Sequence, residues 1–374
     1  MTTPCVLIDA SNLRGGGGLQ VGASVVDELA GIASEGDPRW PWLGSARVQI
    51  SPEVLLGCTR ELSALDIEVV AGSPLRSLTK PRAPRRYDVA LTIFGPDYAP
   101  RRARRQIVGF ADGTSLWPEL AHATGPTRRS KACVRRHVSR AAFRRADTVI
   151  TESAHTAAAL VARWRLPPSQ VEVVPNTVNA VFGHPGGQLA VHLPAAAGNT
   201  LCYPTRAYPH KNIDILGAAA EELARQGAPR STFVLTLTER EWLALSASTR
   251  EAAINVGPLP VAAMPSLYRA CDAAIFPSLL ESFSVTPLEA LASRAPLAAS
   301  DRSFVREVAG EAALYFDPLD PRSIAASIVR LFGDPDATAA RVSVGQRRAQ
   351  AWPSARSRAE RYLTAVARHL DGAP

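Results

Sequence analysis

The chain has 374 residues, of which 46% are hydrophobic and 20% charged, and a formal net charge of +8. This length and composition predict a globular protein with two domains and sizeable cores. No apolar run approaches the ~20 residues that span a bilayer, and residues 1–9 read as a first strand without a leader, so we expect a cytoplasmic protein.

The first half of the chain alternates between strand and helix patterns. It begins with a strand at residues 5–9 and a glycine loop at 14–19, after which apolar residues recur at helical spacing from Val21 to Ile32. Alternation of this kind predicts a parallel sheet in a doubly wound α/β domain. Further strands are expected at 46–50, 66–70, 89–94, 148–150 and 171–174, and helices at 52–65 and 156–165.

A basic stretch between residues 76 and 147 contains 17 Lys/Arg and 5 Asp/Glu. Within it, residues 128–145 read as a basic helix whose apolar positions, such as Val134 and Val138, are too small for deep insertion into a bilayer. Electrostatic contact with an anionic membrane remains open, and a solvated face is the alternative. Aromatic residues are not interleaved with the basic ones, so nucleic acid is not an expected partner.

A second alternating series follows residues 183–199, which have the composition of a linker. We therefore predict domains at 1–182 and 200–354, joined by the linker 183–199 and facing each other across a cleft, with a C-terminal helix within 355–374. The strands are expected at 200–203, 232–238, 273–276, 296–299 and 312–316, and the helices at 213–226, 262–270, 287–293, 321–331 and 355–370.

Two glutamates flank the start of the helix expected at 287–293. Glu281 lies in the loop after the strand 273–276, and Glu289 lies in the helix, so both lie near a strand end where open α/β sheets bind ligands. Thr286-Pro-Leu-Glu289 also matches a capping box, which gives Glu289 a structural alternative. Glu281 has the alternative of a solvated loop acid. The amides of residues 283–285 predict an anion site at the helix N-terminus.

Arg206 and Lys211 follow the first strand of the second domain, five positions apart. An arginine fork and a movable lysine charge at a strand end suit a diphosphate, although either could be a solvated surface cation. The five cysteines and seven histidines show no metal-type spacing, so we expect no metal site and reduced thiols. No P-loop and no G-x-S-x-G motif is present.

These residues resemble the signature of a known family. The pattern Glu281-x7-Glu289 and its surroundings are similar to the family-4 retaining glycosyltransferases of GT-B fold, which pair two Rossmann-like doubly wound domains across a cleft. Other segments share the resemblance. They are residues 204–212, 255–259, 300–301 and 314–318 in the second domain, and 146–147, 153 and 174–176 in the first.

The resemblance implies a metal-independent enzyme that moves a hexose-type sugar, with retention, from a nucleotide-diphosphate donor. The donor nucleotide would be UDP, GDP or dTDP. The acceptor would be a saccharide or a lipid-linked saccharide at the inner membrane face. Arg206 and Lys211 would hold the diphosphate, Glu281 the sugar hydroxyls and Glu289 the ribose. The C-terminal helix would return to the first domain. The implied donor-binding residues are Gly17, Gly18, Gly257, Pro258, Ser282, Phe283, Ser284, Val285 and Glu289.

The first domain departs from the family pattern. Many relatives carry a His-Asp pair near the sugar, but residues 108–117 contain no histidine and resemble instead a Gly-Phe-Ala segment of bacterial surface-polysaccharide glycosyltransferases. Asp112 is therefore the candidate that faces the acceptor. A catalytically inactive glycosyltransferase-like scaffold and a binding module are the alternatives to the enzyme.

Overall fold

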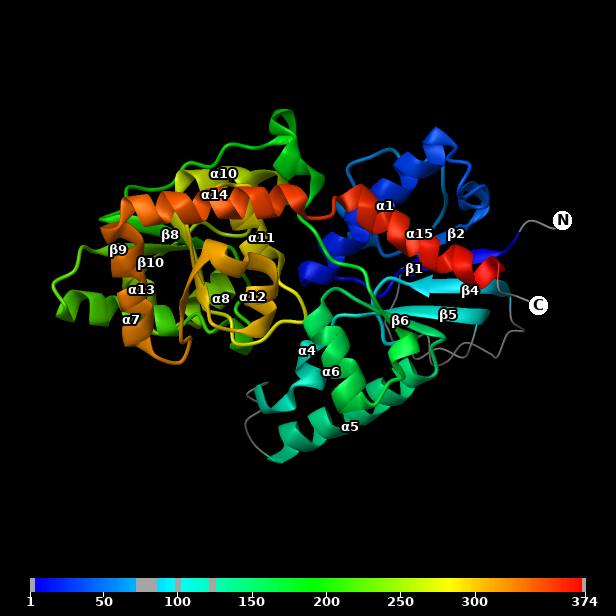
Figure 1. Ribbon diagram of the computed structural model, residues 1–374, viewed down its shortest axis with the longest axis horizontal. Coiled ribbons are helices and arrows are strands. Elements are labelled where there is room, and N and C mark those ends of the chain that lie inside the picture. Colours follow the sequence, from blue (N-terminus) through cyan, green and yellow to red (C-terminus); the bar gives the residue numbers. More distant parts are fainter. Residues whose placement is uncertain (1–3, 72–85, 98–101, 121–125, 372–374) are drawn as a thin grey trace. The chain divides into compact units, whose positions relative to one another are not determined.

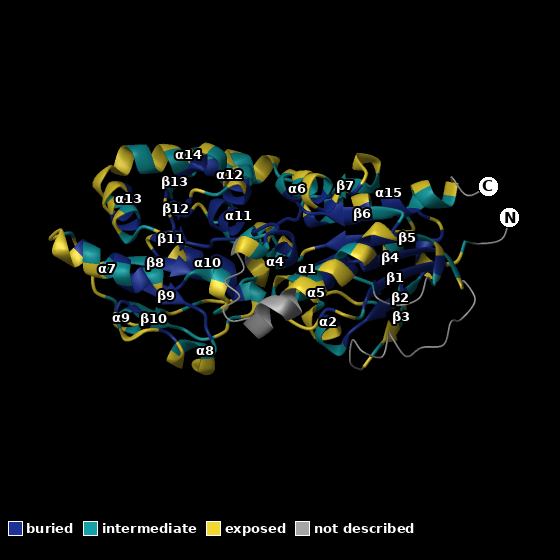
Figure 2. Cartoon of the chain, turned by 90° about the horizontal axis from the view of Figure 1, so that it is seen from below, coloured by how far each residue is buried: buried dark blue, intermediate teal, exposed yellow. Residues whose placement is uncertain are grey.

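The computed structural model describes residues 4–71, 86–97, 102–120 and 126–371. The chain divides into two compact units. Unit 1 comprises Met1–Leu116, Ala123–Asn176 and Pro353–Pro374, and unit 2 comprises Trp117–His122 and Thr177–Trp352. Each unit has its own parallel sheet and its own helices (Figure 1). The sheets are the buried layers, and the helices expose one side to solvent (Figure 2).

Unit 1 is built on a parallel sheet with the strand order β3-β2-β1-β4-β5-β6-β7 in the described residues. All of its strand pairs are parallel, which confirms the α/β prediction. The order reverses beside β1, as in doubly wound sheets. The strands are β1 Val6–Ala10, β2 Arg47–Ile50, β3 Asp66–Val69, β4 Tyr87–Thr92, β5 Ala103–Phe110, β6 Thr148–Thr151 and β7 Val171–Val173.

Two helices that pack together in unit 1 come from opposite ends of the sequence. Helix α15 (Ala355–Asp371) packs along α1 (Gly16–Glu35), as Figure 1 shows, and buries Tyr362, Leu363 and Val366 in the same core as α1. Apolar residues on one face of each helix explain this packing. The other helices are α2 Pro52–Gly57, α4 Gly113–Leu116, α5 Pro126–Arg144 and α6 Ala154–Trp164.

A buried arginine ties three parts of unit 1 together. Arg358 of α15 is 1% exposed; its Nη2 donates to Ser24 Oγ of α1 at 2.8 Å, and its Nη1 donates to Asn176 Oδ1. Burial lowers the pKa of this guanidinium from its ordinary value. Asn176 is the last residue before the long segment of unit 2 begins, so Arg358 holds the end of the unit 1 segment in place.

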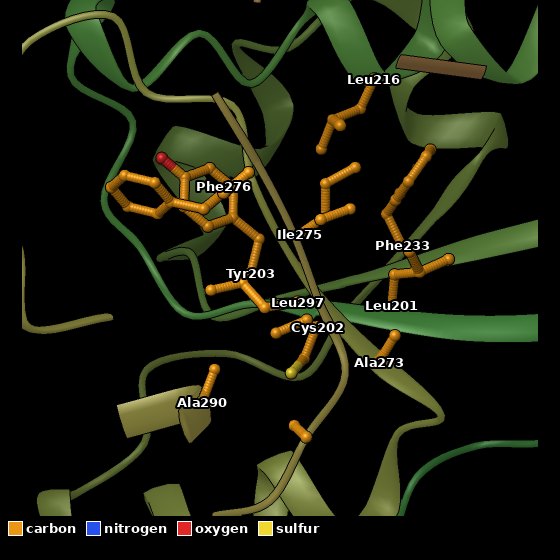
Figure 3. Close-up of a cluster of buried hydrophobic side chains, with 14 of the residues drawn as sticks. Leu201, Cys202, Tyr203, Leu216, Phe233, Ala273, Ile275, Phe276, Ala290 and Leu297 are labelled. Atoms are coloured by element: carbon orange, nitrogen blue, oxygen red, sulfur yellow. The ribbon is translucent and has the colours of Figure 1, made fainter. Parts of the chain in front are cut away.

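Unit 2 contains a parallel sheet with the strand order β10-β9-β8-β11-β12-β13. Its core lies around the two central strands, where Leu201, Tyr203, Ile275 and Phe276 are fully buried (Figure 3). Fully buried strands read as continuous apolar runs, which is why this region was predictable. The strands are β8 Asn199–Tyr203, β9 Ser231–Leu235, β10 Ala253–Asn255, β11 Ala273–Phe276, β12 Leu297–Ser300 and β13 Ala313–Phe316.

The helices of unit 2 contact one another in a connected series. Helix α7 contacts α9 and α13, α13 also contacts α14, and α14 and α12 contact α11. Gly345 of α14 allows α14 and α11 to pack closely, because a Cβ there would lie 2.7 Å from Leu291 Cδ2 of α11. The helices are α7 Ile215–Arg225, α8 Glu239–Leu243, α9 Ala247–Glu251, α10 Met264–Ala270, α11 Val285–Ala292, α12 Ser303–Ala309, α13 Pro321–Gly333 and α14 Pro335–Ala351.

Several predicted boundaries are wrong. The glycine loop expected at 14–19 is largely the first turn of α1, which begins at Gly16. The helix expected at 52–65 ends at Gly57, because the amides of Thr59 and Arg60 donate to the Asp27 carboxylate instead of continuing the helix. Strands β5 and β10 and helices α4, α8, α9, α12 and α14 were not predicted.

The basic stretch 76–147 is only partly described. Residues 76–85, 98–101 and 121–125 lie outside the described residues. The predicted basic helix is confirmed as α5, Pro126–Arg144. Val134 and Val138 on this helix are 64% and 48% exposed. Within the described chain, no helix is both long and apolar enough to cross a membrane.

Candidate functional site

The candidate site lies at one edge of the unit 2 sheet. Strands β8 and β11 are parallel neighbours, so the loops that follow them emerge side by side. These loops carry residues 204–212 and 277–284, the two segments on which the sequence concentrated its candidates. Ligand sites of open α/β sheets are found at this edge, outside the carboxyl ends of the strands.

Lys211 and Glu281 meet at this edge. Lys211 Nζ forms an ion pair with Glu281 Oε1, and the two side chains are 16% and 12% exposed. Ser278 Oγ lies 2.9 Å from the same carboxylate oxygen and 3.2 Å from the carbonyl oxygen of His210. The structure therefore brings together the predicted lysine and the predicted acid, in a partly desolvated setting where charges act strongly.

Backbone hydrogen bonds hold the two loops in place. Leu279 N donates to His210 O at 2.8 Å, and Asn212 Nδ2 donates to Pro318 O at 2.7 Å. Asn212 adopts a left-handed conformation with φ of 56°, which asparagine tolerates better than most residues. Tyr203 OH donates to Lys211 O at 3.1 Å. The side chains of the ion pair thus project from loops that these hydrogen bonds hold in place, as a preorganised site requires.

Arg206 takes a different partner from Lys211. Its Nε donates to both carboxylate oxygens of Glu241, at 2.9 and 3.0 Å, and its side chain is 47% exposed. Glu241 was not among the predicted site residues. The sequence held a signal for part of its role, since Thr238-Glu-Arg-Glu241 has capping-box spacing and forms that box at the start of α8.

The capping box predicted for Glu289 is wrong. Helix α11 begins at Val285, two residues earlier than expected, with Ser284 at the N-cap position. Glu289 therefore lies two residues beyond the N3 position of a capping box, and its side chain is buried. Tyr268 OH of α10 donates to Glu289 Oε2 at 3.0 Å. Burial raises the pKa of Glu289 to about 7, although the bond from Tyr268 lowers it.

The remaining predicted donor-binding residues of unit 2 lie in the loops at the same edge. Ser282, Phe283 and Ser284 are buried in the turn before α11, whose first amides have no intrahelical acceptors. Gly257 and Pro258 follow β10. Gly257 has a φ of 76°, which favours glycine, and its amide donates to Asn255 Oδ1 at 3.3 Å.

The predicted site residues of unit 1 lie in α1 and in the turn before α4. Gly17 and Gly18 lie in the first turn of α1, and a Cβ at Gly17 would meet nothing within 4 Å. Asp112 accepts hydrogen bonds from Thr114 Oγ1 at 2.7 Å and from Ser115 N at 3.1 Å, and it lies 3.7 Å from Arg135 Nη1. The acceptor candidate thus also stabilises the turn into α4, a role that the sequence analysis missed.

Within the described ranges, no group of three or more His, Cys, Asp and Glu side chains is arranged to hold a metal ion. The histidine within the site loop, His210, is partly buried, and burial lowers its pKa.

Two family models match the chain. The model for Glycosyltransferase Family 4 matches residues 26–182, and the model for Glycosyl transferases group 1 matches residues 190–348. The second match contains every candidate of unit 2. Together the two matches span most of the sequence.

The individual relatives that match the chain are also named as glycosyltransferases. The chain is 32% identical over 248 residues to a D-inositol 3-phosphate glycosyltransferase of Thermobispora bispora, covering 60% of this chain and 57% of that one. It is 31% identical over 132 residues to the O-antigen chain mannosyltransferase B of Escherichia coli, covering 34% and 35%. The chain thus matches little more than half, or less, of these relatives' own length.

Among solved structures, the crystal structure of Anabaena Alr3699/HepE in complex with UDP-glucose superimposes with a TM-score of 0.68. The match has 17% sequence identity and covers 98% of this chain and 100% of that one. A likeness at this identity establishes a shared fold.

Proposed function

Because the chain belongs to the family-4 glycosyltransferases of GT-B fold, we propose that it transfers a hexose-type sugar from a nucleotide-diphosphate donor with retention of anomeric configuration. The observation that carries the proposal is the Lys211–Glu281 pair at the carboxyl ends of β8 and β11, beside the N-terminus of α11. A cation, a carboxylate and the N-terminus of a helix at one strand edge are complementary to a phosphorylated, polyhydroxylated ligand.

The proposed chemistry depends on stabilising the leaving group. As the bond from the sugar C1 to the diphosphate oxygen breaks, negative charge grows on the nucleoside diphosphate. Lys211, Arg206 and the amides of residues 282–285 lie in loops at the same edge and would stabilise this charge. Glu281 would hold the sugar hydroxyls and so orient C1, and Glu289 would contact the ribose.

No side chain at this edge is proposed as a nucleophile. The acceptor hydroxyl would attack C1 from the side on which the diphosphate leaves, and its proton would pass to a phosphate oxygen of the leaving group. The new C1–oxygen bond then has the configuration of the old one. This step needs no metal ion. An inverted product, identified from the anomeric proton coupling in NMR, would contradict the mechanism.

The relatives guide the choice of substrates. One structural neighbour binds UDP-glucose, and a relative is named as an O-antigen mannosyltransferase. We therefore propose UDP, GDP or dTDP as the donor nucleotide, and a saccharide or lipid-linked saccharide of polysaccharide synthesis as the acceptor. For unit 1, contact of Gly17 and Gly18 with the donor and of Asp112 with the acceptor stay predictions. So does a location in the cytoplasm with peripheral contact at the inner membrane face.

Donor binding is the first test. We expect one of UDP, GDP and dTDP to raise the melting temperature of the full chain, because a ligand at 100 times its Kd stabilises a fold by about 2.7 kcal/mol. Lys211→Ala should lose most of this shift and the transfer activity, and Glu281→Ala, which removes the proposed contact with the sugar, should lose the transfer activity. Arg225→Ala, which breaks an exposed ion pair with Glu222 on α7, is the matched control and should keep both.

The outcomes separate the alternatives. Binding without turnover of any sugar nucleotide would favour an inactive scaffold. If Lys211→Ala and Glu281→Ala matched the unmodified chain in binding and turnover, the proposed site would be wrong.

A further inference from the structure

Glu241 joins two loops at the edge of the sheet where the candidate site lies. It stands on α8, directly after β9, and β9 is the neighbour of β8 on the side away from β11. Its Oε2 accepts from Thr238 N at 3.0 Å and from Thr238 Oγ1 at 2.7 Å. Its Oε1 accepts from Ala207 N at 3.2 Å, in the loop that leads from Arg206 to Lys211. One carboxylate therefore fixes the backbone of both loops.

The same carboxylate determines how Arg206 is presented. Glu241 binds the guanidinium through Nε, with both carboxylate oxygens within 3.0 Å. Both hydrogen bonds that the Arg206 side chain donates to Glu241 come from Nε. These bonds do not occupy Nη1 or Nη2, which can therefore bind a ligand. These two terminal nitrogens form the fork that binds two oxygens of a phosphate or diphosphate.

Glu241 carries a negative charge at neutral pH. Although burial raises its pKa, the hydrogen bonds from Thr238 and Arg206 lower it to about 2. The side chain is 18% exposed, whereas that of Arg206 is 47% exposed. The acid is thus anchored in the protein, and the arginine projects from it towards solvent.

We infer that Glu241 is a positioning residue, which holds Arg206 by its Nε and directs both terminal nitrogens towards the diphosphate of the donor. The inference rests on the proposed function, because it requires a nucleoside diphosphate at this edge. An arginine has many rotamers, and holding it in one of them before the ligand arrives removes an entropic cost of binding. Arg206 differs from Lys211 in this respect, because its pair with Glu241 uses Nε, whereas the single side-chain nitrogen of Lys211 is the one that pairs with Glu281.

The test uses Glu241→Gln, which separates positioning from helix capping. Glutamine also completes a capping box, so α8 and the melting temperature should be preserved. The carboxylate has two accepting oxygens, but the glutamine amide has only one. If that oxygen accepts from Thr238, the NH2 group faces Arg206 and Ala207 and cannot accept hydrogen bonds from them. We expect the Kd of UDP, GDP or dTDP, whichever binds the unmodified chain, to rise about tenfold or more, as for a lost charge-assisted hydrogen bond. The donor KM should rise similarly, with a smaller change in kcat.

A double-mutant cycle decides whether the effect passes through Arg206. Arg206→Ala should weaken nucleotide binding about as much as Glu241→Gln, and the double variant should lose little more than either single one. Additive losses would show that the two residues act separately and would overturn the inference.

Two controls exclude a general structural effect. Glu222→Gln breaks a comparable glutamate–arginine pair at the far end of α7 and should leave the Kd unchanged. Thr238→Val removes the capping hydroxyl but leaves the Glu241 carboxylate, so it should lower the melting temperature and keep the affinity. If Thr238→Val weakened binding as much as Glu241→Gln, capping would explain the effect.

The remaining outcomes distinguish this inference from the proposed function. If the unmodified chain binds a nucleoside diphosphate and Glu241→Gln binds it equally well or more tightly, the inference fails and the proposed function stands. If the unmodified chain binds none of UDP, GDP and dTDP in calorimetry, the proposed function fails, and the inference with it.

Discussion

At the scale of single residues, Glu289 shows how burial changes the chemistry of a carboxyl group. It lies in unit 2 with Tyr268 as a hydrogen-bond donor, and burial raises its pKa from 4.5 to about 7. The unfolded chain releases this proton above about pH 4.5, whereas the folded chain keeps it up to about pH 7. The free energy of unfolding therefore falls as the pH rises between these values, by about 3 kcal/mol at most.

Glu289→Gln should remove this pH dependence, because glutamine is neutral in both states. We expect the substitution to raise the melting temperature at about pH 8, where the folded chain otherwise carries a buried charge, and to change it little at about pH 4.5. Thermal unfolding followed by circular dichroism over this range would measure the difference. An equal shift at both pH values would show that packing, and not ionisation, governs this site.

The sequence predicted some side-chain neighbours and not others. Lys211 and Glu281 were expected at one edge because each follows a strand in the same sheet, and parallel strands end at the same edge. The partner of Arg206 depends on where the short helix α8 packs, and the partner of Glu289 depends on α10. The pattern of residues along the chain does not show where α8 and α10 pack. Both partners could therefore be identified only from the structure.

At the scale of secondary-structure elements, the same contrast has a physical cause. Buried strands such as β11 are continuous apolar runs and were predicted to the residue. Strand β5 begins with Ala-Arg-Arg-Gln, and α14 buries little beyond Gly345, so neither shows a clear apolar periodicity. Two helix starts were also misplaced: α1 begins inside the glycine run that was expected to form a loop, and Thr286-x-x-Glu289, a pattern typical of a helix start, lies within α11.

Helix α5 carries the prediction of membrane contact. Val134 and Val138 lie one turn apart on the same face of this basic helix and are exposed. We expect the full chain to bind vesicles that contain about 30% anionic lipid more strongly than neutral vesicles, and to lose this binding as salt is added.

The double substitution Val134→Ser and Val138→Ser should weaken binding to anionic vesicles in a flotation assay. Leu56→Ser is a matched control, because Leu56 on α2 of the same unit is 86% exposed. Equal binding to neutral and anionic vesicles, or an equal loss in the control, would contradict a role for this face of α5.

At the scale of the whole molecule, unit 1 is assembled from pieces on both sides of unit 2 in the sequence. The sequence patterns predicted two α/β domains, but the docking of the C-terminal helix followed only from the resemblance to a family. The reason is that an amphipathic helix shows that it packs against something without showing what. The strand order within each sheet was equally absent from the sequence, because periodicity does not specify which strands pair.

Leu363→Ala tests whether the two units are separate in stability. Leu363 of α15 is fully buried in the core of unit 1, so its truncation should cost about 2–5 kcal/mol there. Hydrogen exchange followed by mass spectrometry should show faster exchange in β1, β4 and α1, and unchanged exchange in β8 and β11. Arg361→Ala, an exposed position on the same helix, is the control. Faster exchange throughout the chain would mean that the units unfold together.

The bond between Arg358 and Asn176 has a consequence for synthesis on the ribosome. Arg358 is added to the nascent polypeptide only after the whole of Thr177–Trp352 has been made. It nevertheless belongs to unit 1, whose first strand, β1, is made at the start of synthesis. The contiguous segment is therefore free to fold while the earlier one still exposes apolar surface, which reverses the usual order in which the first domain to be translated folds first. During this interval we expect chaperones to bind the exposed apolar surface of the N-terminal half.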